Sequence, residues 1–160
     1  MKRKKNKKLK EKTLDERETK NLAETQADSP SSGLIEQIRR AAESLYYISE
    51  TDAEVLPFAG TNAKAVTKEE LLKQIGAAPG LPVEEKSFTE FFTRLTEVQD
   101  WYGDEEKEIA GKFARLKEVL ENNIRDLKVF RIGKIELDIY VVGLDAEDTF
   151  LGIKMKAVET

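Results

Sequence analysis

The chain has 160 residues, of which 39% are hydrophobic and 36% charged, and it contains neither cysteine nor histidine. The length suits one domain with a core, and the missing residue types exclude disulfides, thiolate or imidazole metal sites, cysteine nucleophiles and Ser-His triads. Carboxylate chemistry remains, as a hard-metal site or an acid/base pair. We therefore expect a protein that is not an enzyme and has no cofactor of its own.

Residues 1–33 differ in composition from the rest. They hold ten basic and six acidic residues, a net charge of +4, with no aromatic residue, and they end in Asp-Ser-Pro-Ser-Ser-Gly. Such a segment buries too little apolar surface to offset its ordering entropy, so it is predicted to be a disordered tail. No apolar run follows its lysines as in a signal peptide, and none in the chain approaches the roughly 18 residues of a membrane span. We expect a cytoplasmic protein without a membrane partner.

Residues 34–160 form the predicted domain, and they are acidic. Of the 27 basic and 31 acidic residues in the chain, ten and six lie in the tail, which leaves 17 and 25 here and a net charge of −8. An acidic domain suits a partner with a basic cleft. Ordinary solubility explains the same charge, so both interpretations stay open.

The first half of this domain is predicted to be mainly helical. Apolar residues recur at helical spacing from Leu34 to Ile48, with Ser32 as the N-cap. Residues 55–59 form a short apolar strand, which Pro57 confines to a sheet edge or a bulge. Two capping boxes follow. They start at Thr67 and Ser87, and they open one helix that ends near Gly76 and another that carries Phe88, Phe91, Phe92 and Leu95.

The second half adds a longer helix and then strands. Acidic residues 104–106 suit the positive end of a helix that continues to about residue 123. Residues 129–142 alternate around a turn at Gly133-Lys134, and a second turn at 144–148 leads to a third strand. With helices on both faces, these strands predict an α+β fold, a three-layer α-β-α sandwich around a mainly antiparallel sheet.

Several strings resemble one known family. The most distinctive is Gln-Asp-Trp-Tyr-Gly-Asp-Glu-Glu at residues 99–106. Others are Leu-Tyr-Tyr-Ile-Ser-Glu at 45–50, Lys-Phe at 112–113, Val-Phe-Arg-Ile-Gly-Lys-Ile-Glu-Leu-Asp-Ile-Tyr-Val-Val-Gly at 129–143 and Lys-Ala-Val-Glu-Thr at 156–160. In order and spacing, residues 34–160 resemble the nuclease A inhibitor family. The tail lies outside the resemblance, and residues 61–86 depart most from it.

This resemblance implies the three-layer fold and a partner. The family binds, one-to-one, a sugar-nonspecific, divalent-metal-dependent nuclease that cuts both DNA and RNA, and acidic groups of the inhibitor approach the catalytic metal as a phosphate would. Carried over residue by residue, Glu50, Asp100, Trp101 and Thr160 match the family's contact positions. Glu50 and Thr160 would approach the Mg²⁺ of the nuclease, the only metal that the resemblance implies.

The chemistry of these residues suits that role. A nuclease cleft holds a polyanion around Mg²⁺, so a competitor must present negative charge at fixed points. Glu50 precedes a predicted turn, and the α-carboxylate of Thr160 is ionised at neutral pH. Trp101 is of the type that anchors interfaces. Each of these residues also has an interpretation without a partner. Glu50 could be a solvated surface residue, Thr160 a frayed chain end, Trp101 a core residue and Asp100 a helix cap.

Two rival functions remain at this stage. The basic tail could bind nucleic acid directly and make the protein a nucleic-acid-associated adaptor, although a solvated spacer explains the tail equally well. A carboxylate hydrolase would need Glu50 with Asp52, or Glu136 with Asp138, and the latter pair would share one face of a strand.

Overall fold

The structure is a computed structural model that describes residues 30–78 and 80–159. The predicted tail up to residue 29 and the terminal Thr160 lie outside the described residues. The helices are α2 (Pro30–Ala42), α3 (Lys68–Ile75), α4 (Phe88–Thr96) and α5 (Asp104–Asn123). The strands are β1 (Tyr46–Ile48), β2 (Asp52–Glu54), β3 (Leu56–Asn62), β4 (Val83–Ser87), β5 (Arg125–Gly133), β6 (Glu136–Leu144) and β7 (Thr149–Val158). Within these ranges, every helix is too short or too polar to cross a membrane.

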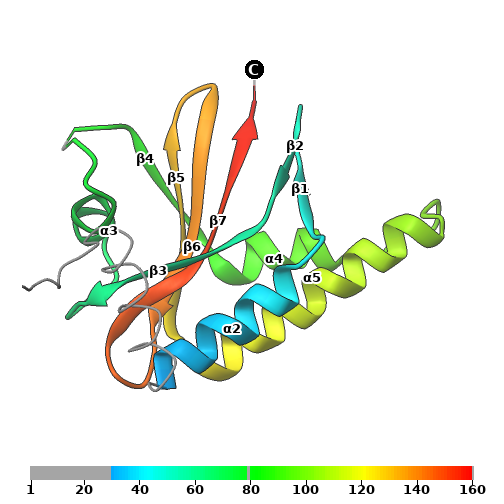
Figure 1. Cartoon of the computed structure of the whole chain (residues 1–160). Helices are drawn as coiled ribbons and strands as arrows, with labels where there is room; N and C mark the ends of the chain where they lie inside the picture. The colour runs from blue at the N-terminus through cyan, green and yellow to red at the C-terminus, as the bar shows by residue number, and fades with distance from the viewer. Residues whose placement is uncertain (1–29, 79, 160) are drawn as a thin grey trace, which may run out of the picture. The chain divides into compact units, whose positions relative to one another are not determined.

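Five strands form one sheet in the order β3-β7-β6-β5-β4, and β1 and β2 form a separate hairpin. Every pairing is antiparallel. Figure 1 shows the long strands β5, β6 and β7 running side by side, with the β1–β2 hairpin beside the end of β7. The predicted α+β class is confirmed.

The sheet separates two apolar cores, because successive side chains of a strand point to opposite faces. Val129 of β5 belongs to one core and its neighbour Phe130 to the other. The first core contains buried residues of α2, α4 and α5, among them Ile38, Phe92 and Leu116. The second core contains Leu71 of α3. Three helices therefore cover one face and α3 covers the other, which is the predicted three-layer sandwich (Figure 1).

The predicted helix starts are confirmed where side chains cap them. The hydroxyl of Thr67 accepts a hydrogen bond from the Glu70 amide at 3.0 Å, and the hydroxyl of Ser87 accepts one from the Glu90 amide at 3.2 Å. These bonds satisfy amides that the first turn leaves without partners. Helix α5 begins at Asp104, as its acidic residues indicate.

Pro57 lies in β3, which is an edge strand that pairs with β7 and shifts register between Ala59 and Asn62. Proline has no amide hydrogen to donate to a second neighbour, so an edge is where it fits. The predicted edge position is confirmed, and the strand covers Leu56–Asn62 rather than residues 55–59.

The first helix has other bounds than the sequence predicts. Helix α2 begins at Pro30 rather than after Ser32, so residues 30–33, which the sequence places in the tail, are helical. It ends at Ala42, because Ser44 takes a left-handed conformation with φ of 62°. The next residues, Tyr46–Ile48, are aromatic and β-branched and form β1. Helical spacing misled here because Leu45, beyond the helix, still packs into the same core.

Two further details of the sheet differ from the sequence prediction. Strand β4 was missed, because Val-Glu-Glu-Lys-Ser at 83–87 is a largely exposed edge without apolar alternation. The β5–β6 turn lies at Lys134-Ile135, one residue later than predicted. Gly133 still belongs to β5 with φ of 114°, and a Cβ there would lie 2.4 Å from the carbonyl oxygen of Glu136.

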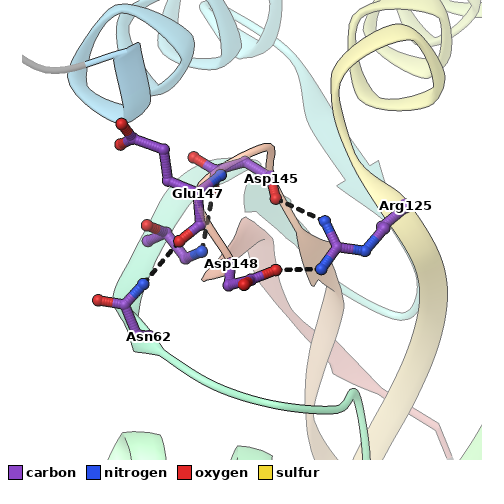
Figure 2. A network of polar contacts seen from close by, with 6 residues as sticks. Asn62, Arg125, Asp145, Glu147 and Asp148 are labelled. Carbon is purple, nitrogen blue, oxygen red and sulfur yellow. Dashed lines mark hydrogen bonds and ion pairs between the residues drawn. The ribbon is translucent and has the colours of Figure 1, made fainter.

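The β6–β7 loop is fixed by a compact polar network, which we call the loop end of the sheet and define as Arg125 with residues 145–149. Asp145 is only 4% exposed, and its Oδ1 accepts the amides of Glu147 and Thr149 at 2.8 and 2.9 Å. Arg125 donates to the Asp145 carbonyl at 2.8 Å and forms an ion pair with Asp148. Figure 2 shows these contacts, with Asn62 donating to the Glu147 carbonyl from β3.

Candidate functional site

Glu50 lies in the turn of the β1–β2 hairpin and is exposed. The turn is closed by Ser49, whose hydroxyl donates to the carbonyl of Thr51 at 3.1 Å. The expectation that a turn projects Glu50 is confirmed. The preceding element is a strand instead of the predicted helix, which places Glu50 at the tip of a hairpin.

The hairpin turn is bonded to the last residue of β7. The Glu50 amide donates to the Val158 carbonyl at 3.2 Å, and the Val158 amide donates to the Ser49 hydroxyl at 3.0 Å. Both backbone polar groups of Val158 are therefore used by the hairpin. Glu50 thus lies beside the last residue of β7, and Figure 1 shows the β1–β2 hairpin beside the end of that strand.

Glu159 is held from the opposite side. Its amide donates to the Ile135 carbonyl at 2.9 Å, and its carboxylate forms an ion pair with Arg131 of β5. Arg131 also bonds Glu84 of the edge strand at 3.3 Å. Sequence reasoning gave no role to Arg131 or Glu159, because only the register of the folded sheet brings them together.

Asp100 and Trp101 occupy the middle of a reverse turn between α4 and α5. The turn is closed by the Tyr102 amide, which donates to the Gln99 carbonyl at 3.0 Å. Trp101 is 75% exposed, and its ring meets that of Tyr102 edge-on at 4.7 Å between centroids. Trp101 is therefore not a core residue. Asp100 is exposed and does not cap α5, because Gly103 is the N-cap of that helix.

A groove joins this turn to the hairpin. A cavity of about 320 Å³ is lined by residues that include Tyr46, Ile48, Arg94, Trp101 and Tyr102. Ile48 is 60% exposed, and Tyr46 and Trp101, which line the same cavity, are exposed as well. Exposed apolar side chains gathered in a groove are typical of a binding surface.

A second cavity, of about 260 Å³, is lined mainly by β1 of the hairpin, β4 and α4. Its lining includes Tyr47, Ile48, Arg94, Arg131 and Glu159, so Ile48 and Arg94 border both cavities. Partial burial raises the pKa of Tyr47, and the nearby Glu159 raises it further, against the opposing effect of Arg131 and Arg94. Tyr47 is therefore neutral at physiological pH.

Tyr46 and Ile48 of the hairpin line the first cavity together with Trp101. We give the name hairpin end to residues 46–52, 99–102 and 158–159. Glu50 lies in the turn of the hairpin and Asp100 lies beside Trp101, and both carboxylates are exposed. Thr160, the fourth predicted contact residue, lies outside the described residues.

The described residues contain no group of three or more acidic side chains placed to hold a metal ion. Of the carboxylates considered for hydrolysis, Asp138 forms an ion pair with Lys156 at 2.8 Å. This contact raises the pKa of Lys156, because the hydrogen bond and the adjacent charge favour its protonated form. Asp138 is therefore paired with a lysine of the neighbouring strand β7.

A family model described as nuclease A inhibitor-like protein matches residues 32–160, and the matched region contains the whole hairpin end. A search of curated proteins finds no match.

Proposed function

The chain belongs to the nuclease A inhibitor-like family, a family of nuclease inhibitors, and on this basis we propose that it blocks the active site of a sugar-nonspecific, divalent-metal-dependent nuclease in a one-to-one complex. The hairpin end is the proposed contact surface. The protein itself carries out no reaction in this proposal.

The hydrogen bonds at Val158 carry the proposal. They fix the turn that presents Glu50 and the last strand of the chain against each other. Two carboxylates, that of Glu50 and the terminal one of Thr160, would then enter the cleft together. A cleft built for a polyanion around Mg²⁺ attracts such a pair, because carboxylate oxygens are ligands that Mg²⁺ accepts.

The groove beside this charged point supplies the contact area. Trp101, Tyr46 and Ile48 are exposed in the free protein and would lose that exposure against a partner. Apolar and aromatic side chains in the centre of an interface exclude water, which strengthens the charged contacts around them. Asp100, next to Trp101, would meet a basic side chain at the rim of the cleft.

The test is a titration of a purified sugar-nonspecific nuclease with the full-length protein, following cleavage of both DNA and RNA. We expect cleavage of both substrates to stop at a sharp end point near one equivalent. Mg²⁺ is kept in large excess over the protein, so that removal of free metal is excluded as the cause. Full activity at saturating inhibitor would contradict the proposal.

A further inference from the structure

Arg94 lies in the last turn of α4 and borders the two cavities that β1 lines. It shares both linings with Ile48 of the hairpin and with Leu95 of its own helix. Arg94 is exposed in the free protein. A cation is therefore available at the groove between the hairpin and the Trp101 turn, in a domain whose net charge is negative.

The guanidinium group of Arg94 has its hydrogen-bonding capacity left over. Across residues 30–78 and 80–159, the structure gives Arg94 no hydrogen bond and no ion pair. Two carboxylates in the linings of the cavities are used elsewhere, because Glu106 accepts the Gly103 amide at 2.9 Å and Glu159 pairs with Arg131. Five N–H donors of Arg94 therefore remain for a partner.

The surroundings of Arg94 decide what kind of partner the groove accepts. Tyr46, Ile48 and Trp101 line the groove with it and are 44%, 60% and 75% exposed. A partner that covers these side chains also removes water from the guanidinium group. Burial of a charge without an opposite charge is costly. An interface over the groove therefore requires an acceptor at Arg94, and a carboxylate is the strongest acceptor that a protein offers.

We propose that Arg94 forms an ion pair with an acidic side chain of the bound nuclease. This inference rests on the proposed function and deepens it, because the interface then has mixed charge. Glu50 and Asp100 would face the basic cleft, whereas Arg94 would face an acidic group beside the cleft. Arg94 is thus a specificity-determining residue, since a nuclease with a basic group at that place would be repelled.

A structural role for Arg94 gives different measurements. An arginine in the last turn of a helix compensates the negative end of the helix dipole. A residue with only that role affects the stability of α4 and leaves the affinity for the nuclease unchanged. Melting temperature and affinity, measured on the same variants, therefore separate the two roles.

The chain offers a matched control in Arg115 of α5. Arg115 is exposed, lines neither cavity, and forms no hydrogen bond or ion pair in the described ranges. Loss of either arginine changes the net charge of the protein equally. Against a basic cleft, a more acidic inhibitor should associate slightly faster. Arg115→Met measures this general effect, and the proposal predicts the opposite sign at Arg94.

The experiment is surface plasmon resonance of the full-length variants on an immobilised sugar-nonspecific nuclease, in the presence of Mg²⁺. We expect Arg94→Met to raise the dissociation constant about thirtyfold, mainly through faster dissociation, because the carboxylate of the nuclease is left buried and unpaired. Arg94→Glu should bind more weakly still. Arg94→Lys, which keeps the charge and loses the planar fork, should lose less. Arg115→Met should stay within about twofold of the unmodified protein.

The sign of the change decides the outcome. If Arg94→Met and Arg94→Glu bind as tightly as the unmodified protein, or more tightly, the ion pair is wrong. A lower melting temperature with unchanged affinity would likewise overturn the proposal and leave Arg94 a structural residue. Should Arg94→Met not fold, Arg94→Lys decides, because it keeps the charge at the end of α4; its dissociation must be faster than that of the unmodified protein.

The two proposals fail in different ways. If the unmodified protein leaves the nuclease fully active, the proposed function is wrong, and the role of Arg94 toward that partner falls with it. If the unmodified protein inhibits and Arg94→Met inhibits equally well, only the role of Arg94 is wrong.

Discussion

The two ends of the central sheet use the same kind of contact for different purposes. At the loop end, Arg125 and the buried Asp145 bond inward, and the carboxylate of Asp145 is occupied by two amides of its own loop. At the hairpin end, hydrogen bonds of Val158 and Glu159 hold the backbone, while Glu50 and Trp101 are exposed. A rigid backbone with outward side chains is what a pre-organised binding surface requires.

The largest expected effect is at Glu50. Glu50→Gln removes the charge and keeps the shape, and we expect it to weaken binding to the nuclease by about 2–5 kcal/mol, because a charged group of the partner would be left buried and unpaired. The melting temperature of the variant is measured alongside, because Glu50 is exposed and also has an interaction within the chain. Isothermal titration calorimetry measures the affinity. Glu54→Gln, in the same hairpin, is the control; equal losses from both variants would mean that only net charge matters.

Trp101→Ala should come next. Aromatic residues at the centre of an interface commonly contribute about 2–4 kcal/mol to binding, and Trp101 is 75% exposed in the free protein. Affinity should therefore fall while the melting temperature stays the same. Val98→Ala, in the same connecting segment and also exposed, provides the comparison. A lower melting temperature with full affinity would make Trp101 a structural residue.

The loop end should give the reverse result. Asp145→Ala leaves the amides of Glu147 and Thr149 without their acceptor, which should lower the free energy of unfolding by about 1–3 kcal/mol. Urea denaturation measures this loss. Asp145→Asn, which keeps one oxygen acceptor, should lose less. At temperatures where both variants are folded, the inhibition end point should not move; a shift would show that the loop end takes part in binding.

The smallest effect concerns the basic tail. Removal of residues 1–29 should leave affinity for the nuclease unchanged, because the proposed contact surface lies in the matched family region. The deletion must stop before Pro30, where α2 begins. Surface plasmon resonance with the nuclease and with DNA separates the hypotheses. Collapse of all binding on removal of the tail would favour the nucleic-acid-associated adaptor.

Local signals in the sequence predicted much of this fold. The capping residues Thr67 and Ser87, the proline of β3 and the alternation in β6 each act over a few residues, and each was interpreted correctly. The end of α2 was missed because Leu45, in the connection between α2 and β1, packs into the core as a helical residue would. Strand β4 was missed because its charged residues are at an exposed edge.

The candidate site could be predicted only in part. Glu50, Asp100 and Trp101 were proposed from the family resemblance, and the structure places all three in turns. The roles of Ser49 and Arg131 could not be found in this way. Ser49 bonds a residue 109 positions away, and Arg131 pairs with one 28 positions away. Such contacts depend on how the hairpin docks and on the register of the sheet, which no local pattern encodes.

Amide hydrogen exchange of the full-length protein, alone and with one equivalent of nuclease, tests the account most directly. We predict new protection at the hairpin end, in residues 46–52, 99–102 and 158–159, and unchanged exchange in residues 145–149. Protection of the loop end, with the hairpin turn and the Trp101 turn exchanging as in the free protein, would contradict it.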